Sequence, residues 1–389
     1  MSARLVESQA DLLEVCAQFR SQEWIALDTE FMRERTYYAQ LCLVQIAVPG
    51  FIACIDPLRV GDVAPLLDLI FDTNILKVMH AARQDLEVFY DLRRRNPGQA
   101  VDSAAETGLV PRPVFDTQIA AACLGYDDQI GYAALVKEIS GVVLDKTHTR
   151  TDWSARPLKA EQLSYAADDV RYLCDVYLHL AASLAESGRS EWPRADFARL
   201  TDPQLYENDP RKAWQRIGAG ERLGRRGQAI LRELAEWREN TAQTSNLPRN
   251  WVMRDAEMIE LARSEPRDIA ELAAVSGIGD RARQKWGGQI LSVIATGGNA
   301  SGEAIWQTAP VLSPDQMELC RRMAKEVDRI AHEQRVSSAL LGTRREIQRL
   351  VLGEPDVRLL QGWRRELVGN TLLSMLAARS ARVSPSAHD

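Results

Sequence analysis

Strand-type patterns are confined to the front of this chain, and that limits its fold more than any other feature. Three short β-type runs, WIALDTEF, AQLCLVQIA and FIACIDPL, follow one another between residues 24 and 58, and a fourth covers residues 75–79. Helical patterns occupy residues 63–71, 85–92, 116–124, 132–139 and 159–184. This order predicts a mixed α/β domain whose helices cover a sheet.

After residue 210 the β-type runs vanish, and helical patterns rich in Arg, Glu and Leu replace them. Two stretches of this part repeat at a shift of 89 positions, so that Pro266 corresponds to Pro355. Residues 296–310 between them are rich in Gly, Ser and Ala, as in a flexible connector that would let the copies move relative to one another. We therefore predict an α/β domain at residues 1–205 and two small all-α domains at residues 206–296 and 311–385.

The cysteines and the hydropathy exclude several classes of protein. The six cysteines are scattered, with no CxxC pair and no closely spaced Cys/His cluster, so neither zinc nor a disulfide framework is indicated. No stretch approaches the roughly 18 apolar residues that suggest a membrane span, and the N-terminus lacks a signal-peptide pattern. We expect a reduced, cytoplasmic protein without a membrane partner.

The net charge of −6 is unevenly distributed along the chain. Residues 1–210 hold 20 basic and 32 acidic residues, a net −12, whereas residues 211–294 and 315–385 each carry a net +4. The bias permits phosphate contact by the helical domains, and it fits an ordinary solvated surface equally well.

Three short patterns contain acids that a metal-dependent enzyme could use. Asp28 and Glu30 stand in LDTEF at the end of a strand, where alternation puts positions i and i+2 on one face. Tyr165 and Asp169 in LSYAADDVRYL are four residues apart in a helical context, so they share one helix face. Asp85 in VMHAARQDLEVF falls in the first turn of a helix that follows a strand.

Each pattern has a simpler explanation when it is taken alone. The acid pair fits charges on a solvent face, the Tyr165 pattern fits an amphipathic helix, and Asp85 fits charge compensation at a helix N-terminus. Asp168 is an alternative to Asp169, although only Asp169 has the i+4 relation to Tyr165. Only the joint order of the three patterns points to one site.

In that order the residues resemble the three exonuclease motifs of the DEDD family, in its subclass with tyrosine. The segments DTEFMRERTYYAQLCLVQIA, MHAARQDLEVF, FDTQIAA and LDKTHTRTDWSARPL are similar to the ribonuclease D family over residues 20–185. The helical copies resemble the HRDC domain, the first more clearly than the second. The resemblance implies a ribonuclease-H-like α/β exonuclease domain followed by two all-α HRDC-type domains.

The resemblance also implies roles for the five residues. Asp28 would bridge two divalent ions, Mg²⁺ or Mn²⁺. Glu30 and Asp169 would complete the ion on the nucleophile side, and Asp85 would hold the other largely through water. Such ions prefer oxygen ligands, so neither Cys nor His nor an organic cofactor is needed. Tyr165 would orient the attacking water, because a phenol with a pKa near about 10 is a poor base at neutral pH.

The implied activity is that of a 3′–5′ exoribonuclease that hydrolyses phosphodiester bonds with two metal ions. Its partner would be RNA with a free 3′ end, above all tRNA precursors and other structured RNAs, and its products nucleoside 5′-monophosphates. A DNA 3′–5′ exonuclease stays open, because only contacts to the 2′-hydroxyl distinguish the two sugars. A catalytically silent nucleic-acid-binding scaffold is the third alternative, although all five residues are intact.

Candidate RNA contacts lie in the segment DKTHTRTDWSARPL. Lys146, Arg150, Trp153 and Arg156 could steer phosphates and stack a base. Packing of the loop onto the core explains Trp153 equally well.

Two further features have mainly structural explanations. His80 ends an apolar strand run, which favours a structural residue over a general base. SGIGDRAR fits a turn between helices better than a phosphate-binding loop, because no strand precedes it. The nearby Arg281, Arg283 and Lys285 are further candidates for contact with a nucleic-acid backbone.

Overall fold

The chain divides into two compact units in a computed structural model that describes residues 3–95, 108–145, 151–299, 310 and 312–383. One unit comprises residues 1–31, 41–205 and 310–389, and the other comprises residues 32–40 and 206–309. Among the residues that the structure describes, none of the helices has the length and apolarity needed to cross a membrane.

A six-stranded sheet of order β1-β4-β3-β2-β5-β6 forms the centre of the first unit. β3 pairs antiparallel with β4, whereas β5 pairs parallel with both β2 and β6, and β1 pairs parallel with β4. Residues 41–47 of β3 are all buried, which explains why this strand is an almost unbroken apolar run. The strands are β1 (Arg4–Val6), β2 (Trp24–Met32), β3 (Gln40–Val48), β4 (Phe51–Ile55), β5 (Leu76–Met79) and β6 (Val114–Asp116).

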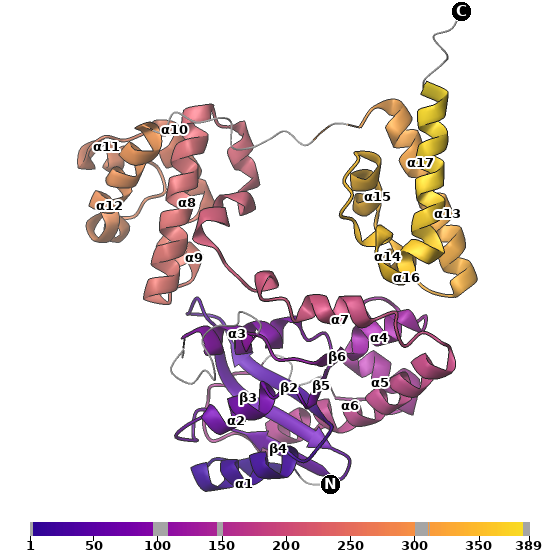
Figure 1. The fold of residues 1–389 in the computed structure, drawn as a ribbon. Coiled ribbons are helices and arrows are strands. Elements are labelled where there is room, and N and C mark those ends of the chain that lie inside the picture. Colours follow the sequence, from indigo (N-terminus) through magenta and orange to yellow (C-terminus); the bar gives the residue numbers. More distant parts are fainter. Residues whose placement is uncertain (1–2, 96–107, 146–150, 300–309, 311, 384–389) are drawn as a thin grey trace, which may run out of the picture. The chain divides into compact units, whose positions relative to one another are not determined.

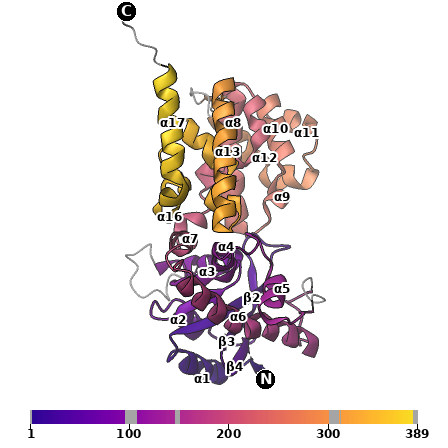
Figure 2. The same cartoon turned by 90° about the vertical axis from the view of Figure 1, so that its right-hand side faces the viewer.

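Helices cover the sheet, as Figures 1 and 2 show. Helix α6 runs for 27 residues, contacts β4 and β5, and packs against α4 and α5. The helices of this part are α1 (Gln9–Phe19), α2 (Ala64–Ile70), α3 (Arg83–Arg95), α4 (Thr117–Cys123), α5 (Tyr132–Ser140), α6 (Ala160–Glu186), α7 (Arg194–Leu200) and the short η3 (Pro203–Leu205).

The α/β pattern predicted from the sequence is confirmed in its main elements. The four β-type runs form β2 to β5, and the five helical patterns form α2 to α6 within a few residues at each end. The sequence reasoning missed β1, α1, β6 and α7. The two strands have three residues each, which is too short for a recognisable periodicity.

The C-terminal helices belong to the same compact unit as the sheet. Trp363 stacks on Trp192 with ring centroids 4.2 Å apart and planes 2° from parallel. Arg364 is only 1% exposed, and its guanidinium donates to Asp196 of α7 at 2.7 Å. These contacts hold the C-terminal helices against α7 and the residues just before it within this unit. The elements are α13 (Pro314–Gln334), α14 (Ser338–Leu341), α15 (Arg344–Val351), η6 (Arg358–Leu360), α16 (Gly362–Arg364), η7 (Arg365–Gly369) and α17 (Asn370–Val383).

The second unit combines the first helical domain with the loop between β2 and β3. Tyr37 of this loop is 9% exposed within the helical core, and its hydroxyl donates to Glu239. Arg249 also donates to Glu239 and lies over the Tyr37 ring. The side-chain oxygen of Asn246 accepts hydrogen bonds from the backbone N–H groups of Tyr37 and Tyr38. The elements are η4 (Pro210–Arg216), η5 (Gly218–Arg222), α8 (Arg225–Ser245), α9 (Arg249–Val252), α10 (Asp255–Ser264), α11 (Ile269–Ala274) and α12 (Asp280–Asn299).

The element bounds confirm the predicted sequence repeat. Helices α8 and α13 both have 21 residues and start 89 positions apart, and α9 and α14 both have four residues at the same shift. Asn246 and Arg335 occupy corresponding positions and end their helices in the left-handed region, with φ of 49° and 54°. The repeated sequence therefore folds into a repeated arrangement of helices.

Candidate active site

Strand β2 presents two carboxylates on one face of the sheet. Its residues Ile25, Ala26 and Leu27 are fully buried and anchor the strand between β3 and β5. Asp28 and Glu30 follow them, and the alternation of the strand turns both side chains to the same side.

Helix α6 brings a third carboxylate to this pair. Asp28, Glu30 and Asp169 each offer a carboxylate oxygen, and these oxygens all lie within 4.8 Å of one another. Tyr165 stands one turn before Asp169 on the helix, and its hydroxyl donates to the Asp169 carboxylate. Three oxygen ligands so close together suit Mg²⁺ or Mn²⁺, so the residues fit the metal ions that the sequence led us to expect.

Asp168 points to other partners than this group. Its carboxylate pairs with Arg171 at 2.7 Å, one turn further along α6. Its backbone carbonyl accepts the hydroxyl of Tyr132 at 3.0 Å. The geometry therefore favours Asp169 over Asp168 as the acid of this helix that faces β2.

Asp85 lies in the first turn of α3, 8% exposed, and is not one of the three acids grouped within 4.8 Å. The hydroxyl of Thr29 donates to its carboxylate at 2.5 Å. The charge of Asp85 nevertheless reaches the group, because it helps to raise the pKa of Asp28. Asp85 thus stands beside the three acids and has a partner of its own.

Asp116 holds the turn that leads from β5 into α3. Its carboxylate accepts hydrogen bonds from the backbone N–H groups of Ala81 and Ala82. It also accepts the backbone N–H of Gln118 and thereby caps the N-terminus of α4. Ala81 has a φ of 52°, a conformation that residues with a Cβ rarely adopt. A single buried carboxylate therefore fixes the starts of two helices, and one of them carries Asp85.

The sequence reasoning missed both Thr29 and Asp116 as contributors to the site. Asp116 had a usable signal, because an Asp directly before an apolar helical pattern is a typical N-cap. Thr29 had none, because its contact with Asp85 joins positions 56 residues apart.

Burial raises the pKa of all four carboxyl groups, and repulsion by neighbouring acids adds to it. For Asp28 burial is the main cause, the charges of the other three acids add to it, and the pKa lies well above its ordinary value. Burial, reinforced by Asp169 and Asp85, raises the pKa of Glu30 to about 9. Burial likewise raises the pKa of Asp169 to about 7 and that of Asp85 to about 6, while hydrogen bonds from neighbouring hydroxyl groups act in the opposite direction.

These pKa values predict how the stability of the metal-free protein depends on pH. Unfolded carboxyl groups titrate near about 4. In the folded protein the pKa values of Asp85, Asp169 and Glu30 range from about 6 to about 9, and the pKa of Asp28 is also raised. Between the two ranges the native state binds more protons than the unfolded state, so the free energy of unfolding falls as pH rises. We expect thermal unfolding in a chelator to show a falling melting temperature from about pH 5 to about pH 9.

Added Mg²⁺ or Mn²⁺ should oppose this fall, because the ions neutralise the ionised carboxylates. Glu30→Gln removes a group with a raised pKa, so this variant should show a shallower fall than the unchanged protein. A melting temperature that stays level or rises over the same pH range in the chelator would contradict the prediction.

Trp153 and Arg156, two of the candidate RNA contacts, both pack against other parts of the protein. Trp153 is 3% exposed, with its ring 6.2 Å from that of Tyr165. Arg156 donates to both carboxylate oxygens of Asp56, at 2.5 and 2.8 Å, and to the carbonyl of Cys42. The burial of Trp153 agrees with the packing explanation that the sequence left open for it, and Arg156 adds a second contact between this loop and the sheet.

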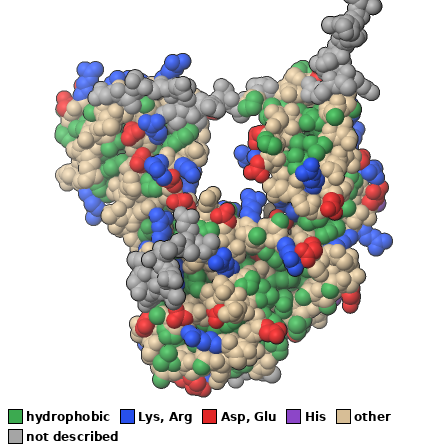
Figure 3. Space-filling model, viewed as in Figure 1, with side chains coloured by type: hydrophobic (Ala, Val, Ile, Leu, Met, Phe, Trp, Pro, Cys, Tyr) green, Lys and Arg blue, Asp and Glu red, His purple; other side chains and the backbone are tan. Residues whose placement is uncertain are grey.

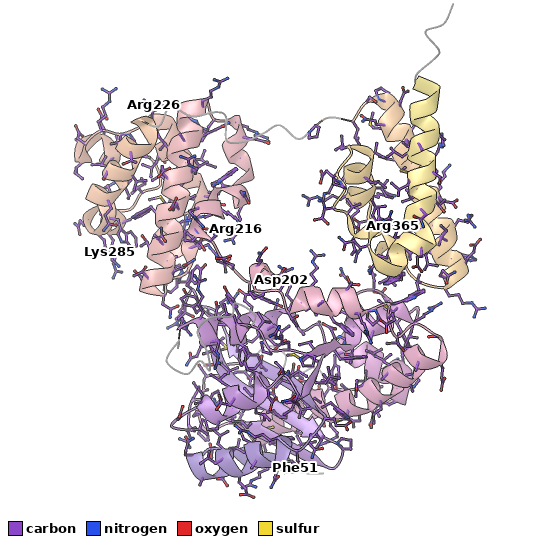
Figure 4. The ribbon with its side chains drawn as sticks, in the orientation of Figure 1. Phe51, Asp202, Arg216, Arg226, Lys285 and Arg365 are labelled. Atoms are coloured by element: carbon purple, nitrogen blue, oxygen red, sulfur yellow. The ribbon has the colours of Figure 1, made fainter. Side chains whose placement is uncertain are left out.

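The other candidate RNA contacts lie in two different parts of the chain. Lys146 and Arg150 lie outside the described residues. Figure 3 shows Lys and Arg side chains at several places on the surface of the second unit. Lys285, labelled in Figure 4, lies over the ring of Trp286, and Arg283 donates to the carbonyl of Ile278.

His80 has the surroundings of a structural residue. Its Nε2 lies 3.1 Å from the carbonyl of Ile130, and its Nδ1 lies 2.9 Å from the hydroxyl of Thr117. Burial lowers the pKa of its ring, which keeps the imidazole neutral. These contacts agree with the structural explanation of His80.

The covered sheet and its group of carboxylates define this chain as a 3′–5′ exonuclease with appended helical domains. A family model described as 3′-5′ exonuclease matches residues 3–185, and an HRDC domain model matches residues 227–294.

Full-length relatives narrow the class. A ribonuclease D of Gluconacetobacter diazotrophicus is 37% identical over 383 residues, covering 96% of this chain and 93% of the relative. A ribonuclease D of Acidiphilium cryptum is 38% identical and covers 97% of this chain and 96% of the relative. The crystal structure of Escherichia coli RNase D has a TM-score of 0.82 at 32% identity, covering 97% of this chain and 99% of that one. The chain belongs to the ribonuclease D family and is a metal-dependent 3′–5′ exoribonuclease.

Proposed function

We propose that this enzyme trims the 3′ ends of tRNA precursors and other structured RNAs and releases nucleoside 5′-monophosphates. The observation that carries the proposal is the group of Asp28, Glu30 and Asp169, with the Tyr165 hydroxyl bonded to Asp169. The E. coli relative is described as an exoribonuclease involved in structured RNA processing, which supports this class of substrate.

The proposed catalytic residues are Asp28, Glu30, Asp85, Tyr165 and Asp169, and the four acids among them would hold two divalent ions, Mg²⁺ or Mn²⁺. When bound, such ions supply hydroxide at neutral pH and stabilise the departing 3′-oxygen.

Tyr165 has a separate role in the proposal. Its hydroxyl, which donates to Asp169, is close enough to that acid to orient a water molecule beside it. Removing the proton of that water would need a stronger base than a phenol at neutral pH, so Tyr165 acts by positioning. No organic cofactor is required for this chemistry.

The proposal also includes the domain boundaries and the cellular location. The domain boundaries are placed at residues 1–205, 206–296 and 311–385. The location is the cytoplasm, which is supported by six cysteines that are all free and mostly buried, as expected in a reducing compartment.

Digestion of a tRNA that carries a 3′ extension tests the function directly. We expect nucleoside 5′-monophosphates to appear with Mg²⁺ or Mn²⁺ and to be absent with a chelator, as measured by chromatography and mass spectrometry of the products. Internal cleavage, or products that end in a 3′-phosphate, would contradict the proposal.

RNA and DNA oligonucleotides of one sequence, both with free 3′ ends, separate the remaining alternatives. Faster release from RNA is expected. Equal or faster release from DNA would favour a DNA exonuclease, and binding without release in either metal would favour a scaffold.

A further inference from the structure

We propose that Thr29 is a positioning residue, which orients the carboxylate of Asp85 for metal binding. The inference rests on the proposed metal-dependent function. Thr29 stands between the two acids of β2, and the alternation of the strand turns its side chain away from theirs. Its hydroxyl reaches instead to Asp85, 56 residues along the chain, with an oxygen-to-oxygen distance of 2.5 Å.

The buried surroundings of this hydrogen bond strengthen it. Thr29 is 6% exposed and Asp85 is 8% exposed, so water competes little for either group. A hydroxyl has one proton to donate, and a bond from it to a carboxylate is of the stronger, charge-assisted kind. The bond therefore favours one orientation of the Asp85 side chain, and it also opposes the effect of burial on the pKa of Asp85.

Two independent supports thus hold Asp85. Asp116 fixes the backbone turn before α3. The Thr29 hydroxyl, together with backbone N–H groups of Thr29 and Asp85, holds the carboxylate at the end of the side chain. Asp28, Glu30 and Asp169 are close enough to share an ion, whereas Asp85 stands outside their group. Loss of the Thr29 hydroxyl should therefore weaken the binding of one of the two metal ions and leave the binding of the other unchanged.

Thr29→Val tests this directly, because valine keeps the branched shape of threonine and removes only the hydroxyl. We expect kcat on RNA to fall about 10- to 100-fold, the range found when an outer partner of a metal ligand is lost. KM should change little. Titration with Mn²⁺, followed by calorimetry, should show one ion bound about 10- to 100-fold more weakly and the other as before.

Thr29→Ser is the matched variant, because it keeps the hydroxyl, and it should restore both the metal affinity and the rate. Wild-type Mn²⁺ affinity and rate in Thr29→Val would overturn the proposal. A lower melting temperature with both ions bound normally would also overturn it, because that result indicates a purely structural role. Failure of the unchanged protein to release nucleotides would overturn the proposed function alone, since the Mn²⁺ titrations of the three proteins still compare Thr29 with its variants.

Discussion

Asp28→Asn is expected to lower the rate of RNA digestion by more than about 100-fold, because even the loss of an outer partner of a metal ligand costs up to about that much. Asp28 is the acid on which the charges of Asp85, Asp169 and Glu30 all act, so its position is central among them. RNA binding, measured by a gel or fluorescence assay, should survive. Retained full activity would contradict the assignment of the site.

The same substitution should stabilise the protein in the absence of metal. Asn removes a buried carboxyl group whose ionised form is repelled by three neighbours. The melting temperature in a chelator should therefore rise relative to the unchanged protein, most clearly at high pH, where more of the group is ionised. Such an exchange of stability for activity is typical of functional sites.

Asp68→Asn is the control for this experiment. Asp68 is an exposed acid of α2 whose carboxylate lies 4.0 Å from Arg20. Exposed pairs of this kind contribute at most about 1 kcal/mol. The control should therefore change neither the rate nor, to any large extent, the melting temperature.

Asp196→Ala is expected to cause the largest loss of stability, because it leaves the Arg364 guanidinium buried without its carboxylate. Arg364 would keep its hydrogen bond to the carbonyl of Leu340 and its position over the Trp363 ring, but neither partner carries a negative charge. Arg358 adds a second positive charge 3.8 Å from Asp196. Breaking a buried ion pair from one side costs about 3 to 5 kcal/mol. The thermal unfolding transition of the unit that contains these helices, followed by calorimetry, should shift to a clearly lower temperature.

A neighbouring ion pair at the start of α7 provides the matched control. Arg194 and Glu191 form an exposed pair at 3.1 Å, so Glu191→Ala should shift the transition only slightly. Arg364→Met in the Asp196→Ala background should recover much of the loss, because an apolar side chain needs no partner there. Equal effects of Asp196→Ala and Glu191→Ala would contradict the idea that the C-terminal helices are fastened through this pair.

The outline of the fold and the face that each pair of candidate site residues shares were predictable because their signals are local. A strand reveals itself by alternation and a helix by its period, so the face shared by Asp28 and Glu30 and the face shared by Tyr165 and Asp169 follow from spacing alone. The helical repeat was predictable for the same reason, since two copies of one pattern must satisfy the same packing. Their elements start 89 positions apart, as the sequence indicated.

The structure decided the partner of each side chain. Trp153 and Arg156 have the composition of an RNA-binding loop, yet the structure buries the first and pairs the second with Asp56, 100 residues away. Tyr37 is one of two tyrosines in a polar turn, and its partner Glu239 lies 202 residues further along. Composition does not distinguish a cation that meets RNA from one that meets a buried acid.

The sequence alone therefore determined the longer strands and helices and which acids share a face, because these depend on neighbours within a few residues. It also determined the family to which the chain is similar, through the joint order of its motifs. Only the tertiary structure decided that Asp169 rather than Asp168 joins the acids of β2, that Thr29 holds Asp85, and that the C-terminal helices are fastened to α7. The physical reason is that hydrogen bonds and ion pairs act over a few ångströms in space. Folding, and not the order of residues, brings such distant groups within that range.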